Sequence, residues 1–308
     1  MSTHQFDVVT GAFGYTGGYI ARTLLARGRG VRTLTHHPER RAGFDGAIEV
    51  LPLDFDPDRL AEALRGADIL YNTYWVRFDH GGVTFDRAVE QCRALFAAAA
   101  AVGVRRIVHF SVTNADPDSP LPYFRGKGRV EAALRGCGVP HAILRPALVF
   151  GIEDILLNNI AWCLRRLPLL GLPGNGRYEV QPVFAGDLGR LAVEAGEQSA
   201  STAADAVGPE RMDYRSLVDL IAQAVGSRAK IAGLPPRLTL LAAGLLGIVN
   251  RDIMLTADEV AGLTGGLLVS AGPPTGVTRF TDWIAANGAQ LGRYYRSELA
   301  AHYDGRSG

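Results

Sequence analysis

Residues 10–18 read TGAFGYTGG, directly after the apolar stretch FDVV at 6–9 and at the start of a helix-like segment at 15–28. Glycines at every third position let a backbone turn tightly and approach a pyrophosphate. The pyrophosphate sits at the helix N-terminus, where unpaired N–H groups and the helix dipole favour anions. The alternative is a glycine-rich turn that serves only close packing of the backbone and binds no nucleotide. The position after the first strand predicts a dinucleotide-binding turn made of Gly11, Phe13, Gly14, Tyr15, Thr16 and Gly17.

Strand-like and helix-like segments alternate through the first half of the chain. The strand-like segments lie at 6–11, 31–35, 48–54, 67–75, 105–111 and 140–146, and the helix-like segments at 15–28, 57–66, 86–102 and 123–136. Alternation with short connections predicts an α/β fold with a Rossmann-type, doubly wound parallel sheet. We expect an NAD(P)-binding domain over 1–150 and a smaller substrate-side region over 151–308, with 179–210 returning to the sheet.

Composition limits the class of protein. The chain has 308 residues, 47% of them hydrophobic, and a formal net charge of +1, which gives no overall bias toward nucleic acid or anionic membranes. The three cysteines lack metal-ligand spacing and no signal peptide precedes the first strand, so we expect no metal site and a cytoplasmic location. Monomer and homodimer both stay open.

The longest apolar run is LTLLAAGLLGIV at 238–249. It is well short of the ~20 residues that a membrane-spanning helix needs. We expect a helix that faces the core. A helix at a membrane surface or against a partner is the alternative.

The end of the second strand bears on the choice of nucleotide. NAD-preferring sites usually carry an acidic residue there, which accepts a hydrogen bond from the ribose 2′-OH. This chain has His36 at that position, with Arg40 close by to pair a 2′-phosphate. The pattern favours NADP over NAD, although a solvated loop that binds nothing is the alternative.

The stretch PYFRGKG at 122–128 contains one of the two lysines in the sequence. Tyr123 and Lys127 are four residues apart and share one helix face, where an ammonium lowers the pKa of a phenol from about 10. Such a pair suits acid–base chemistry, and the lysine can also reach a ribose. Gly126 and Gly128 weaken a helix, so we expect other groups to approach that backbone closely.

Several motifs together resemble one superfamily. TGAFGYTGG, the residues at 123–127 and LRPALVFG at 144–151 resemble the extended and atypical short-chain dehydrogenases/reductases, which include NAD-dependent epimerases and dehydratases. The stretch at 181–195 resembles the segment where such chains return to the sheet. Residues 278–303 are similar to the C-terminal end of epimerase-like proteins related to the nucleotide-binding accessory subunit of respiratory complex I.

The resemblance implies an NAD(P) cofactor and an active site of Tyr123, Lys127 and a hydroxyl residue. Ser111 and Thr113 follow the fifth strand-like segment, and Thr113 is the better match although a serine is usual there. The resemblance also suggests that Asp54 contacts the adenine edge and that Pro146 backs the nicotinamide. Asp54 and Pro146 could equally be turn residues that contact no ligand.

Two further segments are candidates for ligand contacts. YNTYWVRFDH at 71–80 follows the fourth strand-like segment and should open at the cofactor edge. We assign its Asn72 to the cofactor and predict substrate contacts for Tyr74, Trp75, Arg77, Asn158, Asn159 and Trp162. An aromatic core with a surface arginine is the equal alternative for 71–80.

Three classes of function are compared. The preferred one is an NAD(P)-dependent oxidoreductase or epimerase that moves a hydride to or from a carbinol or carbonyl carbon of a small molecule. The alternative is a non-catalytic NADP-binding regulator or accessory subunit, for which loss of Tyr123 or Lys127 would be the signature. A nucleic-acid-binding module lacks the basic charge that it would need.

Overall fold

The structure, a computed structural model, describes residues 6–39, 43–44 and 46–303. The chain forms two units. The first unit contains Met1–Pro146 and Ala185–Ala206, and the second contains Ala147–Phe184 and Val207–Gly308. The first unit thus takes up a later segment that lies within the 179–210 range expected to return.

A seven-stranded sheet forms the centre of the first unit, in the order β11-β6-β5-β4-β1-β2-β3. All of its strand pairs are parallel. The chain direction across the sheet reverses between β1 and β4, which is where a doubly wound sheet binds its ligand, at the carboxyl ends of the strands. The strands are β1 (Phe6–Thr10), β2 (Gly30–Thr35), β3 (Ile48–Pro52), β4 (Ala67–Asn72), β5 (Arg106–Phe110), β6 (His141–Pro146) and β11 (Thr202–Ala206).

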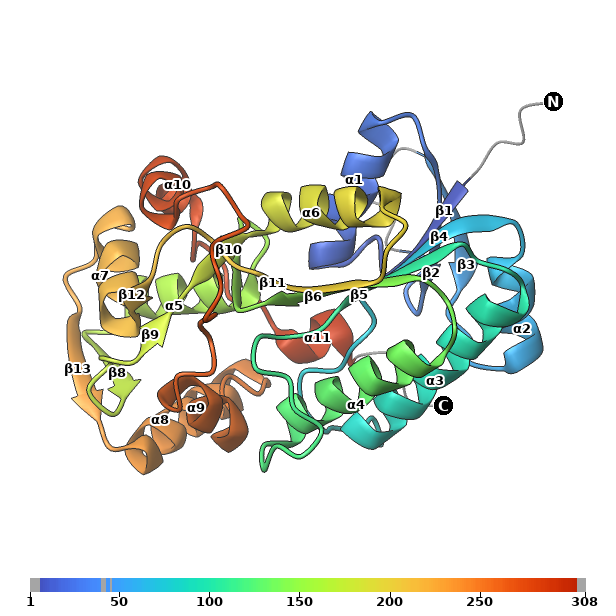
Figure 1. Ribbon diagram of the computed structural model, residues 1–308. Helices are drawn as coiled ribbons and strands as arrows, with labels where there is room; N and C mark the ends of the chain where they lie inside the picture. Colours follow the sequence, from blue (N-terminus) through green and yellow to red (C-terminus); the bar gives the residue numbers. More distant parts are fainter. Residues whose placement is uncertain (1–5, 40–42, 45, 304–308) are drawn as a thin grey trace. The chain divides into compact units, whose positions relative to one another are not determined.

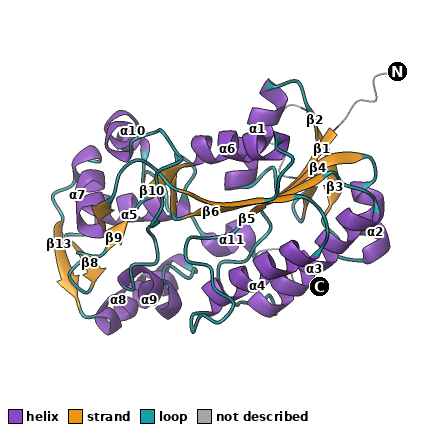
Figure 2. Cartoon of the chain, in the orientation of Figure 1, coloured by secondary structure: helices purple, strands orange, loops and turns teal. Residues whose placement is uncertain are grey.

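Helices cover both faces of this sheet (Figures 1 and 2). They are α1 (Tyr15–Ala26) and α6 (Ala185–Glu197) on one face, and α2 (Pro57–Leu64), α3 (Phe85–Ala101) and α4 (Pro122–Gly136) on the other. Gly189 lets α6 lie close against α1, because a Cβ there would come within 2.8 Å of the Tyr19 carbonyl oxygen. The predicted Rossmann-type fold is therefore confirmed.

A buried arginine fixes the returning segment. Arg106 on β5 is fully buried and donates hydrogen bonds to the carbonyls of Ala195, at 2.7 Å, and Ala200, at 2.9 Å. These two carbonyls lie in α6 and in the turn before β11. Burying a guanidinium is unfavourable unless its donors are used. The bonds therefore hold α6 and β11 to the sheet.

The second unit combines short strands with helices around an aromatic core. Phe150 contacts the rings of Phe184, Phe280 and Trp283 at centroid distances between 5.1 and 5.6 Å. Its strands are β7 (Leu148–Phe150), β8 (Leu169–Pro173), β9 (Glu179–Val180), β10 (Pro182–Phe184), β12 (Met212–Asp213) and β13 (Lys230–Leu234). Its helices are α5 (Ile155–Arg166), α7 (Tyr214–Ala224), α8 (Pro236–Asn250), α9 (Ala257–Thr264), α10 (Phe280–Asn287), a 3-10 turn at Gly288–Gln290 and α11 (Glu298–His302).

Helix α8 contains the apolar run at 238–249, and the expectation that it faces the core is wrong. Thr239 and Gly247 are its buried residues and Leu240 and Leu246 are half-buried, whereas its other large aliphatic side chains are exposed. The small residues pack inward because Gly247 must lie close to the Asp252 carbonyl. Across the described part of the chain, no helix is long and apolar enough to cross a membrane.

Candidate active site

The glycine turn connects β1 to α1. Gly11 has a φ of +71°, a conformation that glycine adopts without strain, and its N–H donates to Leu34 on β2 at 2.9 Å. A Cβ on Gly17 would overlap the carbonyl of Gly11, so the first turn of α1 lies directly on the loop. Gly14 begins the helix without a side-chain cap, and the first helical turn has no acidic residue. This geometry fits a pyrophosphate, which would take the uncapped N–H groups and the positive helix end.

An aromatic cluster lies beyond the ends of β2, β3 and β4. The Tyr74 ring lies 4.9 Å from Phe55 and 6.2 Å from His36, measured between centroids. The Tyr74 hydroxyl donates to Gln91 on α3. Tyr74, predicted to contact substrate, thus lies next to the His36 position predicted to contact the cofactor. Phe55 was missed because the stretch LDFD was interpreted only through Asp54.

Asp54 is held by its own turn. Its carboxylate accepts hydrogen bonds from the Asp56 N–H at 3.0 Å and from Arg59 at 2.5 Å. The Asp56 bond and then Arg59 lower the pKa of this carboxyl. Asp54 therefore stabilises its own turn, and its contact with the adenine edge stays a prediction. Arg40, the predicted partner of a 2′-phosphate, lies outside the described residues.

Asn72 has a structural role that differs from its predicted contact with the cofactor. It is fully buried, and its Oδ1 accepts from Thr10 at 3.1 Å and from the Tyr74 N–H at 3.0 Å. Its Nδ2 lies 3.1 Å from His109 Nδ1 and 3.8 Å from Cys92 Sγ. All four hydrogen-bonding positions of the amide are used within the protein. Asn72 thus joins the ends of β1, β4 and β5.

Tyr123 lies in the first turn of α4 and Lys127 one turn later. Lys127 is 4% exposed, and its Nζ donates to the Phe110 carbonyl at the end of β5 at 2.7 Å. Burial lowers the pKa of Lys127 to about 7. Its other neighbours are Cys92 and His109. Burial raises the pKa of the Cys92 thiol to about 11 and lowers the pKa of His109. Neither supplies a negative charge, so the ammonium stays poorly compensated.

Glu131 is the carboxylate nearest to Lys127 along α4, and arginines already neutralise it. Arg145 on β6 pairs with it at 2.8 and 2.5 Å, and Arg135 pairs with it at 2.9 Å. Burial raises the pKa of Glu131, but its bonds from Arg145 and Arg135 and the nearby Ser111 hydroxyl lower that pKa further, so the group is ionised. Ser111, a candidate catalytic hydroxyl, therefore faces Glu131.

Thr113 lies two residues beyond Ser111 and is completely buried. Its N–H donates to the Pro146 carbonyl at 3.0 Å, and the Ser111 N–H donates to Leu144 at 2.8 Å. The stretch from Ser111 to Thr113 therefore continues alongside the end of β6. Thr113 and Pro146 therefore meet at the carboxyl edge of the sheet, and their roles in catalysis and at the nicotinamide stay predictions.

Trp75 covers the lysine. Lys127 Nζ lies 4.6 Å from the indole centroid, a cation–π distance, and the ring also contacts Tyr123 and Phe85. A Cβ on Gly126 would come within 2.9 Å of Trp75 Cη2, and one on Gly128 would overlap the backbone of Asp116 and Pro117. The expectation of close approach at both glycines is confirmed.

Trp75 and Arg77, both predicted to contact substrate, have different surroundings. The buried indole Nε1 of Trp75 has no hydrogen-bond partner among the described residues, which leaves a donor beside Tyr123. Arg77 is half-buried, and its guanidinium lies 5.8 Å from the Phe78 ring.

In the second unit, α5 holds the segment that follows α10. Asn158 accepts from the Gly292 N–H at 3.1 Å and donates to Ile152 and Asp154, and Asn159 bonds both backbone groups of Arg296 at 2.9 Å. Trp162 packs against Tyr295 at 5.4 Å. These three side chains, predicted to contact substrate, are thus used to anchor the C-terminal segment.

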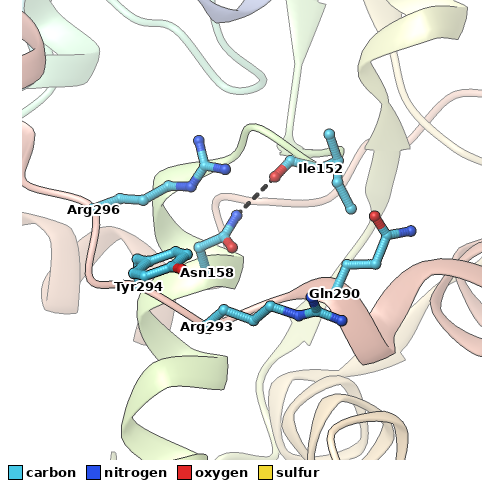
Figure 3. Close-up of a pocket in the computed structure, with 6 residues that line it drawn as sticks. All are labelled: Ile152, Asn158, Gln290, Arg293, Tyr294 and Arg296. Carbon is cyan, nitrogen blue, oxygen red and sulfur yellow. Dashed lines mark hydrogen bonds between the residues drawn. The ribbon is translucent and has the colours of Figure 1, made fainter.

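A pocket of about 400 Å³ lies beside Asn158 in the same unit (Figure 3). It is lined by Ile152, Asn158, Gln290, Arg293, Tyr294 and Arg296. The residues from the C-terminal segment were missed as ligand-contact candidates, although the spacing of RYYR at 293–296 was a usable signal.

Comparison with known proteins agrees with this arrangement. Residues 11–150 match the model of a family described as NAD(P)H-binding. The chain is 27% identical over 262 residues to the mitochondrial NADH-ubiquinone oxidoreductase 40 kDa subunit of Neurospora crassa, covering 82% of this chain and 68% of that one. It is 24% identical over 282 residues to the mitochondrial NADH dehydrogenase [ubiquinone] 1 alpha subcomplex subunit 9 of Arabidopsis thaliana, covering 85% and 70%.

Solved structures show the same fold. An NADPH-dependent quinone oxidoreductase from Escherichia coli, complexed with NADPH, superposes with a TM-score of 0.73 at 20% identity, covering 91% of this chain and 99% of that one. A nucleoside-diphosphate-sugar epimerase from Staphylococcus aureus gives 0.71 at 16% identity, covering 91% and 100%. The chain therefore carries a domain of the NAD(P)H-binding family at 11–150, has the fold of these reductases and epimerases, and is similar in sequence to subunits of mitochondrial NADH dehydrogenases.

Proposed function

We propose that this protein is an NAD(P)-dependent oxidoreductase or epimerase that acts on a carbonyl or carbinol carbon, with Tyr123 as its acid–base group. When bound, the reduced nicotinamide supplies a hydride, which becomes the new C–H bond as the C=O π bond opens. Tyr123 gives its proton to the carbonyl oxygen, and Lys127 returns a proton to the phenolate. The reverse direction removes the same proton and hydride from a carbinol.

The observation that carries the proposal is the buried Lys127 one helical turn from Tyr123. A lysine whose pKa lies at about 7 can both give and accept a proton near neutral pH, which the ordinary pKa does not allow. The ammonium has three N–H donors, and the bond to Phe110 uses one of them. The side chain thus has capacity for a ribose as well as for proton exchange.

Two further groups support a reaction at this place. Thr113 lies beside Pro146 at the carboxyl edge of the sheet, where its hydroxyl would orient a substrate oxygen toward Tyr123. The indole N–H of Trp75 is buried without a partner, so a substrate oxygen would satisfy it. The substrate-binding roles of Arg77 and of α5 stay predictions.

The nucleotide we propose is NADP, with NAD as the alternative. No acidic residue stands at the His36 position, and the nearby Asp54 is already engaged by Arg59 and its own turn. We expect NADPH to bind more tightly than NADH, and His36→Asp to shift the ratio of the two affinities toward NADH by roughly tenfold. An acidic residue would accept from the 2′-OH and repel a 2′-phosphate.

Titration of intrinsic fluorescence with each nucleotide measures both affinities. His80→Asp, a change at an exposed histidine of the same unit, is the matched control and should leave the ratio unchanged. Equal or tighter binding of NADH by the unmodified protein would contradict the proposed preference.

A non-catalytic, nucleotide-binding subunit is the second candidate. The observation in its favour is the closure of Trp75 over Lys127, since the indole would have to move before the lysine could reach a ligand. The relatives named as subunits of NADH dehydrogenases also favour it, and it would give the protein partner proteins. This reading expects nucleotide binding without hydride transfer.

Hydride transfer separates the two candidates. The protein is incubated with NADPH deuterated at C4 and with a panel of quinones, aldehydes, ketones and sugar nucleotides, and products are examined by mass spectrometry. The proposal expects deuterium on carbon in a product, and at least about a hundredfold less of it per unit time with the Tyr123→Phe variant. Tight NADPH binding with no transfer to any class of acceptor would favour the accessory reading.

A further inference from the structure

Helix α8, labelled in Figure 1, exposes several large aliphatic side chains to solvent. At 3.6 residues per turn, five of them fall within roughly 100° of the helix circumference. Their exposed fractions range from 51% to 77%, and they are Leu238, Leu241, Leu245, Ile248 and Val249. We call these five residues the α8 stripe. Isolated exposed leucines are common, whereas a continuous stripe on one helix marks an interaction surface.

The buried side of α8 explains why the stripe faces outward. Thr239 and Gly247 are the residues that α8 buries, and a Cβ on Gly247 would come within 2.5 Å of the Asp252 carbonyl oxygen. Only a small residue permits that approach. The five side chains of the α8 stripe therefore lie on the exposed side, while Leu240 and Leu246 are half-buried.

The chain segment that contains the stripe carries charges of one sign. Between residues 220 and 251 the sequence contains no Asp or Glu, although the chain as a whole is nearly balanced. The same segment carries four exposed cations, Arg228, Lys230, Arg237 and Arg251. Arg237 precedes the stripe and Arg251 follows it, so both ends of the apolar surface are basic.

We propose that the α8 stripe docks on the surface of an anionic lipid bilayer. The apolar run is too short to cross a membrane, so the helix would lie in the plane of the interface with its stripe among the acyl chains. Arginines at the two ends of α8 would contact the acidic headgroups. Charge complementarity thus selects the occupant.

A second copy of the chain fits this surface less well. A two-fold symmetric contact pairs each patch with itself, so it would bring the cations of both copies together, and the 220–251 segment offers no carboxylate to pair with them. An anionic bilayer offers the opposite charge and an apolar layer at once.

Vesicle flotation tests the proposal on the full-length protein. The two vesicle compositions are pure phosphatidylcholine and phosphatidylcholine with about one third phosphatidylglycerol. We expect binding to the anionic vesicles at least tenfold stronger than to the neutral ones, and weaker binding as salt rises.

The double change Leu241→Glu with Ile248→Glu should abolish binding to the anionic vesicles, and Arg237→Gln with Arg251→Asn should weaken that binding several-fold. Asparagine is chosen at 251 because that residue has a φ of +52°, which asparagine tolerates.

The matched control is Val277→Glu, at a 70% exposed valine of the same unit outside α8, and it should bind vesicles like the unmodified protein. NADPH affinity, measured on every variant, should stay constant and shows that each is folded. No flotation with anionic vesicles would overturn the proposal. A third outcome is a dimer that forms with rising protein concentration, does not float with vesicles and is dissociated by Leu241→Glu with Ile248→Glu. That result would assign the stripe to a second copy instead.

Discussion

Replacing Lys127 with methionine should raise the free energy of unfolding at pH 7 by on the order of 2–4 kcal/mol. The ammonium is buried under Trp75, and burial lowers the pKa of Lys127 from 10.5 to about 7. A lowered lysine pKa means that the folded state disfavours the charged form relative to the unfolded chain. Methionine has a similar length and carries no charge, so it removes that penalty while filling the space.

The pH dependence gives the sharper test of this prediction. The penalty on the folded state is present in full below about pH 7, the folded pKa, and is lost as the pH rises toward 10.5, the unfolded value. The advantage of Lys127→Met over the unmodified protein should therefore shrink steadily between pH 7 and pH 10. Urea unfolding of both proteins across this range measures it.

Lys230 supplies the control, since it is the other lysine of the chain and is exposed. Lys230→Met should change the unfolding free energy by less than about 0.5 kcal/mol at every pH. A loss of stability in Lys127→Met, or an advantage that does not change with pH, would show that the ammonium is well compensated where it lies. A lysine kept at such a cost is typical of a functional site.

Local patterns predicted the framework of the fold. The glycine turn at 11–17 and the alternating segments gave the parallel sheet and its helices, because turn chemistry and the periodicity of apolar residues act over a few neighbours. The same reasoning predicted that other groups approach Gly126 and Gly128. It could not say that these are Trp75 and the backbone at 116–117, because those partners are brought together only by tertiary packing.

The direction of side chains was less predictable. Asn72 is a candidate because it follows the fourth strand, and Asn158 and Asn159 because amides bind sugar hydroxyls, yet all three amides bind the protein's own backbone and side chains. The apolar composition of the run at 238–249 predicts a helix that faces the core. That prediction is wrong because composition alone does not show which side of a helix packs against the protein. In α8 the small residues at 239 and 247 decide that. Net charge likewise concealed the local excess of cations.

Tyr123→Phe should reduce the rate of hydride transfer by about 10²- to 10⁴-fold, the usual contribution of a general acid–base group. The phenyl ring keeps the contacts of Tyr123 with Trp75 and Phe85, since those are ring contacts, and loses the hydroxyl. Affinity for NADPH should therefore change by less than about threefold, which is under 1 kcal/mol. Tyr178→Phe, at a tyrosine of the second unit whose ring stacks on Tyr214, is the matched control and should retain full activity.

The most direct test of the proposed active site is the turnover number of Tyr123→Phe relative to the unmodified protein, with saturating NADPH and one accepted carbonyl substrate. The proposed chemistry predicts a ratio of about 0.01 or lower, with NADPH binding retained. A ratio near one would contradict it, because a reaction that proceeds without the Tyr123 hydroxyl does not use Tyr123 as its acid or base.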